Sequence, residues 1–578
     1  MSYLATTALT QFWQKNEPLL CLGTQCLEVE ESELAGYGPL EIMPYPWAGR
    51  DARDKARAEI DALFELYLDR LVPRMEAIHG AGYSDHAWRV VMGSWLFQAL
   101  NVIYDRYHVI EAATHRWNFT SILPEHMVAP VPDSAYHFYY HGITDQYNFW
   151  LYGEVMRFLG CHLETKKEKL EFRSDEPAIS GMRAAARKLL GQSFGRAAGL
   201  LGDYCRVIGH DTYFGFGVDL ELMLKSRFRY LPSIMPSRPE IEVSIDGRMR
   251  DSLTDGLPAL SKFETFFNSM LPRIIPKSFL EGFDIMKRIG HAREIRPRRL
   301  IMSSGAWHYD EPFLHHAAAH HDAGGALAGV QHGGTYGVHA WVPHQSLEIS
   351  KVDRFYSWGW EKPATLPKVK PFIASKMAGR GEIGASNKRD GILFISTGES
   401  RYPMSHQIVA GQLDTYFALQ HDFFSALPDN LVSKVTYRDL GERFGRRHVE
   451  RLSSAFETIM MDDWSASFTE RMAGNRICVI DHLSTTWLEA LAANVPVIIY
   501  GADAYDHVED LPERLAVLQK GGIIFETAAE AAEALVKRYD DVESWWKCRT
   551  VQAARKEFCK SFLPDGASVA SAWLKELL

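Results

Sequence analysis

The fold is decided by the stretch Gly329-Val330-Gln331-His332-Gly333-Gly334-Thr335-Tyr336-Gly337, taken with Asp481-His482-Leu483-Ser484-Thr485-Thr486-Trp487 further along the chain. Each follows an apolar run, 327–330 in the first case and 477–480 in the second, that ends in a tight polar turn. An open α/β sheet places reactive groups in this way, at the carboxyl ends of its strands. Two such turns predict two facing sheet domains with a substrate between them.

The composition bounds the class of protein. The chain has 578 residues, of which 46% are hydrophobic and 12% aromatic, as in soluble globular proteins with an ample core. The net charge of -10 argues against a dedicated nucleic-acid binder, which would normally carry a basic domain. The 7 cysteines are scattered and include no C-x-x-C pair, which indicates a reducing compartment and neither a disulfide framework nor a zinc site.

No export or membrane-spanning signal is visible. Residues 1–15 include Gln, Trp and Lys where a signal peptide needs an apolar core, and no later run approaches ~18 apolar residues. We therefore expect a cytoplasmic protein. Peripheral contact with the inner membrane remains compatible with the sequence.

Strand-like and helical patterns alternate along most of the chain. Apolar residues recur at helical spacing over 53–107, and the run 300–303 reads as a strand that leads through a helix at 311–321 into the Gln-His-Gly turn. A further strand is expected at 392–395. This alternation predicts an α/β protein with parallel, doubly wound sheets.

The same patterns predict the domain organisation. Residues 1–369 are expected to form an N-terminal α/β lobe with a large helical insertion. Residues 370–387, rich in Gly, Lys, Arg and Ser, are interpreted as a linker. Residues 388–545 would form a C-terminal α/β lobe, and the helices of 546–578 would pack back across both lobes.

The Ser484-Thr485-Thr486 turn is a candidate phosphate site. It lies between a buried strand and a helix, and the free N–H groups at a helix N-terminus bind phosphate. Simple helix capping explains the same residues equally well. Glu489 is placed to accept hydrogen bonds from ribose hydroxyls, or it is a solvated helix residue.

His332 is a candidate catalytic base. It stands at a strand end beside two glycines, which let a ligand approach closely, and the imidazole group in general, with an ordinary pKa of about 6.5, suits proton transfer. Asp145, in aromatic surroundings, is the carboxylate that we expect to act as nucleophile or base. A helix N-cap is the competing interpretation for Asp145.

Arginines after two other strand-like runs are candidates for binding a phosphate or a sugar carboxylate. Arg401 follows the turn 396–400, and Arg438 follows a run ending at 437. Surface salt bridges would explain either one alone. The helix 311–321 carries His315, His316, His320 and His321; we interpret these as a solvated face rather than a metal site, because the H-E-x-x-H pattern is absent. No metal is expected.

The chain resembles the surface-polysaccharide transferases of bacterial O-antigen and nonulosonic-acid gene clusters, which are distantly similar to the retaining β-Kdo transferases. The resemblance rests on the segments 22–26, 88–96, 104–106, 331–337, 358–360 and 486–496. It implies a GT-B glycosyltransferase fold, in which both lobes are Rossmann-like. The lobe of residues 1–369 would lie on the side of the sugar and acceptor, the lobe of residues 388–545 would bind the nucleotide, and the donor would be CMP-activated. The resemblance also implies that Ser484, Thr485 and Glu489 meet the nucleotide, while His332 and Asp145 face the sugar.

The function expected from residues and resemblance together is metal-independent transfer of an ulosonic acid, either Kdo or a nonulosonate such as pseudaminic or legionaminic acid. The donor would be the CMP ester, with no other cofactor, and the acceptor a surface glycan, glycolipid or protein. The donor-binding set would also include Gln331, Gly333, Arg401, Arg438, His482 and Thr486. Two alternatives stay open: a CDP-glycerol-type polyol-phosphate transferase, and a non-catalytic glycan-binding or assembly protein.

Overall fold

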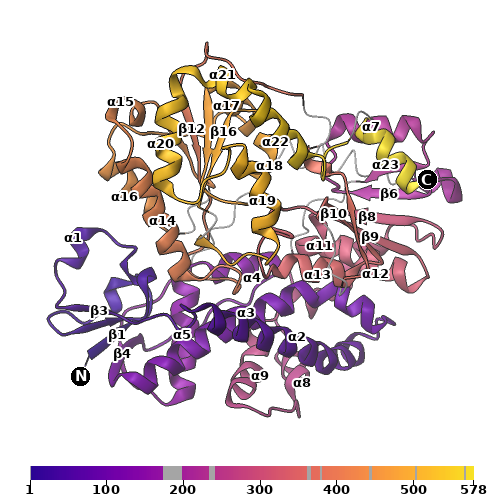
Figure 1. Cartoon of the computed structure of the whole chain (residues 1–578). Helices are drawn as coiled ribbons and strands as arrows, with labels where there is room; N and C mark the ends of the chain where they lie inside the picture. The colour runs from indigo at the N-terminus through magenta and orange to yellow at the C-terminus, as the bar shows by residue number, and fades with distance from the viewer. Residues whose placement is uncertain are drawn as a thin grey trace.

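Three sheets form the framework of the molecule (Figure 1). The structure is a computed structural model that describes residues 2–172, 198–233, 241–360, 366–377, 381–441, 445–501, 504–564 and 568–578. Every pairing between the named strands is parallel, and helices alternate with strands along the chain. The α/β class predicted from the sequence is confirmed.

The first sheet has the order β3-β2-β1-β4-β5. Its strands are β1 (Ser2–Ala5), β2 (Leu19–Cys21), β3 (Leu40–Ile42), β4 (Phe119–Pro124) and β5 (His162–Lys166). Residue 2 pairs with residue 119, so the long connection through the helices returns to the same sheet. The region predicted as one N-terminal lobe, residues 1–369, therefore begins with a separate parallel sheet, and the two long helices of residues 50–116 lie in the connection between β3 and β4 of that sheet.

The middle sheet has the order β11-β10-β9-β8-β6-β7. Its strands are β6 (Val207–His210), β7 (Tyr230–Ser233), β8 (Leu300–Ser303), β9 (Ala326–Val330), β10 (Arg354–Trp358) and β11 (Val369–Phe372). The linker predicted from residue 370 begins too early, because β11 pairs with β10 through its backbone. The strand order reverses between β6 and β8, and such a point is where ligands bind in open α/β sheets.

The C-terminal sheet has the order β14-β13-β12-β15-β16. Its strands are β12 (Ile392–Ile395), β13 (Val435–Arg438), β14 (Met460–Met461), β15 (Ile477–Ile480) and β16 (Val497–Ile499). All four residues of β12 and of β15 are buried, as expected for parallel strands covered on both faces. Here the order reverses between β12 and β15, so the turns after these two strands form the expected ligand edge.

Two long helices connect the parts. They are α2 (Arg50–His79) and α3 (Asp85–Arg116), which run across the lower half of the molecule in the view of Figure 1, with α8 (Gly247–Thr254) and α9 (Lys262–Ile274) beneath them. Ser84 caps α3 by accepting from the backbone nitrogen of Ala87. Helix α3 is apolar around most of its circumference and buried along most of its length, as a helix in the core of a large protein is. One continuous core joins it to the first and middle sheets.

The remaining helices of the first and middle parts follow the strands. They are α1 (Glu31–Leu34), α4 (Ala135–Gly142), α5 (Asp145–Leu159), α7 (Phe216–Lys225), α8 (Gly247–Thr254), α9 (Lys262–Ile274), α10 (Phe283–His291), α11 (Ala306–Tyr309), α12 (Glu311–Asp322) and α13 (Pro343–Lys351). Helices α11 and α13 follow β8 and β9, so both start near the carboxyl edge of the middle sheet.

The C-terminal part has its own helices. They are α14 (Ala410–Ser425), α15 (Asp429–Val432), α16 (His448–Ala455), α17 (Phe468–Gly474), α18 (Thr486–Ala492), α19 (Leu511–Lys520), α20 (Ala528–Arg538), α21 (Val542–Lys547), α22 (Arg549–Cys559) and α23 (Val569–Leu577). Helix α23 packs on the middle sheet, where the ring of Trp573 lies 5.0 Å from Tyr356 and 4.6 Å from Phe372. Among the helices of the described residues, none is long and apolar enough for a membrane crossing.

Candidate active site

The Gln-His-Gly-Gly turn directly follows β9. The side chain of Gln331 is buried, and its Oε1 accepts from the backbone nitrogen of Trp358 at 2.8 Å and from Nε1 of Trp360 at 2.7 Å. Its Nε2 donates to the carbonyl of Gly333 at 2.7 Å. Gln331, which we predicted to bind the donor, is thus engaged with protein atoms and holds the turn in shape.

His332 is paired with a buried carboxylate. Its Nδ1 lies 2.6 Å from Oε1 of Glu348 on α13, and its ring is partly exposed. Burial alone would raise the pKa of Glu348, but the imidazoles of His332 and His308 hold it at about 2. A carboxylate that accepts from Nδ1–H leaves the lone pair of the imidazole on Nε2. In this orientation Nε2 of His332 is the ring nitrogen that could accept a proton.

A second histidine shares the same carboxylate oxygen. Nε2 of His308, on α11, lies 2.5 Å from Oε1 of Glu348, and the hydroxyl of Tyr336 donates to that oxygen at 3.0 Å. Burial lowers the pKa of His308 to about 4. We call His308, His332, Tyr336 and Glu348 the histidine–glutamate cluster. Sequence reasoning missed His308 although it follows strand β8, and nothing in the local sequence marks Glu348, which lies inside a helix.

The cluster is also where the described residues could hold a cation. The ligand atoms of His308, His332 and Glu348 all lie within 4.8 Å of one another. Both imidazoles and the Tyr336 hydroxyl converge on one carboxylate oxygen, and hydrogen bonding accounts for that convergence. Metal-free catalysis remains a prediction.

A buried lysine anchors the helix that carries Glu348. Nζ of Lys351 donates to Oγ of Ser94 on α3 and to the carbonyl of Trp307, both at 2.6 Å. Burial lowers the pKa of Lys351 to about 7. These bonds tie α13 to α3 and to α11, so they fix the position of the cluster.

The two motifs that decided the fold are in direct contact. The backbone nitrogen of Gly334 donates to Oγ1 of Thr485 at 3.0 Å. A Cβ on Gly334 would lie 2.2 Å from the carbonyl oxygen of Ser484, so only glycine fits this approach. Ser484, Thr485 and Thr486 are half-buried. The Thr485 hydroxyl binds Gly334 and makes no cap bond to α18.

The rest of the 481–489 segment makes contacts of its own. Nδ1 of His482 lies 2.9 Å from Asp481, and its Nε2 lies 3.0 Å from the Thr486 hydroxyl. Glu489 is buried and pairs with Nζ of Lys376 at 3.3 Å. Nζ of Lys376 also lies 5.9 Å from the ring of Tyr213. Glu489 is therefore an ion-pair partner rather than a solvated helix residue.

Asp145 and Arg401 meet each other. Asp145 is the first residue of α5, and the cap of that helix is Thr144. One oxygen of Asp145 accepts from Arg401, and the other accepts from the hydroxyl of Tyr402 and, at 3.3 Å, from the backbone nitrogen of Ala8. The structure thus brings Asp145 and Arg401 together in a contact between the N-terminal and C-terminal parts, with both carboxylate oxygens occupied.

Arg438 is placed at the end of β13. Its guanidinium pairs with Asp462 and lies 3.9 Å from the ring centroid of Trp464. The arginine therefore has a carboxylate partner in its own lobe.

The histidines of α12 were predicted to form a solvated face, and this is wrong. His315, His316 and His320 are buried, because α12 packs between α3 and α10. Nδ1 of His315 lies 3.0 Å from the hydroxyl of Tyr83, and Nε2 of His320 lies 3.0 Å from the carbonyl of Arg299. Burial lowers the pKa of His315 to about 3. These rings are neutral members of the core.

A cavity of about 260 Å³ adjoins the cluster. It is lined by the helices α3, α4, α11 and α13, by the turn after β9 and by the loop after β12, and we call it the α3 cavity. Polar groups on its wall come from Gln98, Asn101, His308, His344 and Glu399. The wall includes no lysine or arginine among the described residues.

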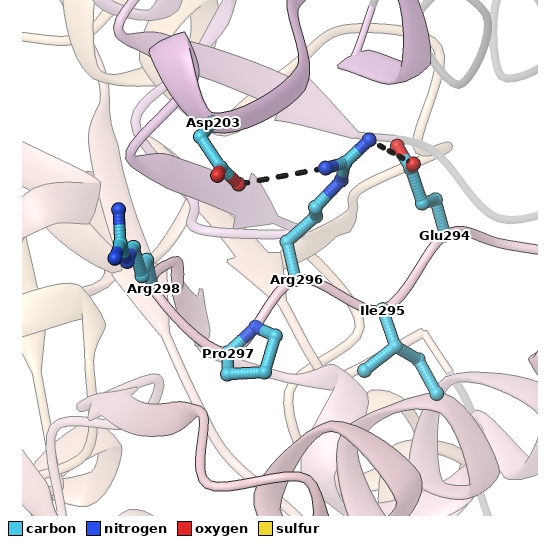
Figure 2. Close-up of a pocket in the computed structure, with 6 residues that line it drawn as sticks. All are labelled: Asp203, Glu294, Ile295, Arg296, Pro297 and Arg298. Carbon is cyan, nitrogen blue, oxygen red and sulfur yellow. Dashed lines mark hydrogen bonds and ion pairs between the residues drawn. The ribbon is translucent and has the colours of Figure 1, made fainter.

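A larger hollow opens on the surface and shares no lining residue with the α3 cavity (Figure 2). Its volume is about 570 Å³, and Asp203 and residues 294–298 line it. Figure 2 shows Arg296 between Asp203 and Glu294, with which it forms ion pairs. Both carboxylates have this arginine as a partner, and no histidine is present. The α3 cavity and the cluster beside it are therefore the better candidate site.

Comparisons with known proteins give one family. The model described as the LIC12162 family transferase matches residues 2–577. No curated protein matches the chain. Among solved structures, the spinosyn forosaminyltransferase SpnP is similar over 64% of this chain and 99% of that chain, at 12% identity and a TM-score of 0.31. This likeness is too loose to carry a conclusion, so the fold rests on the sheets themselves.

Proposed function

The chain belongs to the LIC12162 family of transferases, and from this premise we propose that it is a glycosyltransferase that uses a CMP-activated ulosonic acid. The sugar would be Kdo or a nonulosonate, and the acceptor a bacterial surface glycan, glycolipid or protein. The resemblance of segments such as 331–337 to surface-polysaccharide transferases supports the sugar and the nucleotide.

The proposal rests on the position and the contacts of His332. His332 stands at the carboxyl end of β9 with its Nδ1 on the buried carboxylate of Glu348, and the same turn contacts Thr485 at the edge of the C-terminal sheet. A base held by a buried carboxylate, at the point where two strand-end edges meet, is the arrangement that transfer to a hydroxyl group needs.

The proposed reaction uses the cluster directly. Nε2 of His332 takes the proton of the acceptor hydroxyl as its oxygen bonds to the anomeric carbon of the sugar. The bond from that carbon to the phosphate oxygen breaks, and its electron pair leaves with CMP. Glu348 stabilises the imidazolium that forms, because it is a buried carboxylate beside the ring. Asp145 as a nucleophile remains the competing prediction, and its two oxygens are already bound to Arg401 and Tyr402.

The leaving phosphate also needs a positive partner. Lys376 pairs with Glu489 and lies beside the ring of Tyr213, whose centroid is 6.5 Å from that of His332. We assign to Lys376 the neutralisation of the single CMP phosphate, which carries less charge than a diphosphate. A lysine in this position supports a reaction without a divalent metal.

A thermal-shift screen tests the donor. A ligand at 100 times its dissociation constant adds ~2.7 kcal/mol to the free energy of unfolding, so CMP should raise the melting temperature of the full chain, and UMP and GMP should not. The same shift should persist in EDTA. Stabilisation by CDP-glycerol without any effect of CMP would instead favour a polyol-phosphate transferase, and indifference to every nucleotide would favour a non-catalytic glycan binder.

A further inference from the structure

The wall of the α3 cavity selects against anions. Its polar lining consists of neutral amides, hydroxyls, histidines and one carboxyl group, that of Glu399, and it contains no lysine or arginine within the described residues. Lys351 and Arg106 contact the lining residues Ser94 and Pro403 but are not part of the wall themselves. A phosphate or carboxylate would therefore enter this space without a direct cationic partner, which is costly away from water. The donor, which carries a phosphate and a sugar carboxylate, does not fit these requirements.

Two buried atoms on this wall lack a hydrogen-bond partner among the described residues. They are Oε1 of Gln98 on α3 and Nδ1 of His308. Because Nε2 of His308 is turned to the Glu348 carboxylate, its Nδ1 is a lone pair that can only accept. Buried polar atoms are normally hydrogen-bonded, so both positions call for a ligand that donates hydrogen bonds.

Gln98 has a second constraint. Its Nε2 donates to the hydroxyl of Tyr309 at 3.2 Å, so Oε1 is the atom of the amide that has no hydrogen-bond partner among the described residues. A ligand hydroxyl can both donate and accept, so it satisfies Gln98 in either orientation of the amide. A carboxylate or phosphate oxygen only accepts, and it cannot satisfy the lone pair of His308.

The remaining wall suits the apolar face of one sugar ring. Tyr139 and Tyr309 line the cavity with their ring centroids 6.1 Å apart, and Phe97, Leu347 and Met404 add apolar surface. At about 260 Å³ the cavity lies just below the ~300 to 1,000 Å³ of sites for drug-sized ligands. It therefore has room for a single ring rather than for a nucleotide sugar.

We propose that the α3 cavity is the acceptor subsite and that it binds an uncharged, hydroxyl-bearing sugar through Gln98 and His308. The assignment of the cavity to the acceptor rests on the proposed function, whereas the chemical class of the ligand follows from the residues of the wall alone. His308 acts as a positioning residue here: it shares Oε1 of Glu348 with His332, and their ring centroids are 5.1 Å apart. A sugar held at His308 would place a hydroxyl beside the proposed base.

Ligand-detected saturation-transfer NMR on the full-length protein tests the proposal. The probes are methyl glycosides of neutral hexoses and N-acetylhexosamines, with methyl glucuronide and galactose 6-phosphate as charged counterparts. We expect signals from at least one neutral glycoside and none from the charged sugars. Gln98→Met should weaken that binding by roughly tenfold, the effect of about one hydrogen bond, while Gln11→Met, an exposed glutamine elsewhere, should not.

Three results would overturn the proposal: no neutral glycoside binds, a charged sugar binds as well as its neutral counterpart, or Gln98→Met binds as the wild type does. Melting temperatures of both variants show that they are folded. CMP is titrated into the same samples. Neutral sugar binding without CMP binding would leave the subsite standing and remove the donor proposal, and CMP binding without sugar binding would do the reverse.

Discussion

The backbone nitrogen of Gly334 donates a hydrogen bond to Oγ1 of Thr485 at 3.0 Å, joining positions 151 residues apart in the sequence. Gly334 follows β9 of the middle sheet, and Thr485 follows β15 of the C-terminal sheet. The contact fixes the separation of two strand-end edges, one of which carries His332. The geometry of the proposed site therefore depends on Gly334, a glycine to which we assign no contact with the substrate.

Gly334→Ala should destabilise the contact between the lobes. Its Cβ would lie 2.2 Å from the Ser484 carbonyl, so backbone must move, at a cost of about 1–3 kcal/mol typical of overpacking. Chemical denaturation measures the loss. Gly333→Ala is the matched control, because a Cβ there meets its nearest neighbour, the Tyr336 ring, at 3.7 Å. Equal stability of the two variants would show that the close approach is not required.

Glu348→Gln should lower kcat by roughly 10²–10⁴, the contribution of a well-oriented general base, with a smaller change in KM. The amide keeps the volume of the side chain but cannot stabilise an imidazolium. If Glu348 acts through His332, the double variant with His332→Ala should be no slower than His332→Ala alone. The exposed Glu557→Gln serves as control. Wild-type turnover of Glu348→Gln would remove the pairing from the mechanism.

Asp145→Asn should lower stability because it leaves Arg401, whose side chain is 8% exposed, without its carboxylate partner. Breaking a buried pair in this way costs about 3–5 kcal/mol. Combining it with Arg401→Met should recover part of the loss, as urea denaturation would show. If Arg401→Met alone stays active, a folded double variant without activity would support Asp145 as the nucleophile. An active one would leave it a purely structural residue.

Lys351 should make stability depend on pH. Its pKa of about 7 in the folded protein lies below the ordinary 10.5, so between these values the unfolded chain holds the proton more tightly and the free energy of unfolding rises with pH. The slope is at most about 1.4 kcal/mol per pH unit, and it vanishes below the folded pKa. Lys351→Met should lack this rise. If the difference in the free energy of unfolding between wild type and Lys351→Met stays constant between the two pKa values, Lys351 is not a buried, neutral lysine in the folded protein.

Short apolar strands were predictable because burial on both faces leaves an unbroken apolar run before a polar turn. Strands β8, β12 and β15 lie at 300–303, 392–395 and 477–480 as the sequence indicates. The separate first sheet was not predictable, because residue 2 pairs with residue 119 across a long helical connection. No local pattern in the sequence indicates which strand the chain pairs with after that connection. The burial of the α12 histidines was not predictable for a related reason. A neutral imidazole packs in a core, but a helix rich in histidine looks polar in the sequence.

The candidate site also has a part that the sequence predicts and a part that it does not. His332 and Thr485 could be brought together from sequence because both follow buried strands of parallel sheets, whose carboxyl ends gather at one edge. Glu348 could not be found, because a glutamate inside a helix has no local mark of its tertiary partner. Asp145 and Arg401 were each predicted to meet the substrate, and only the folded chain reveals that they meet each other.

The most direct test measures CMP release from CMP-linked ulosonic acids by the full chain and by His332→Ala, with and without EDTA. We expect release by the wild type in the presence of EDTA and a loss of roughly 10²–10⁴ in rate for the variant. Equal rates for the two proteins, or turnover of CDP-glycerol with no release from any CMP-linked sugar, would contradict it.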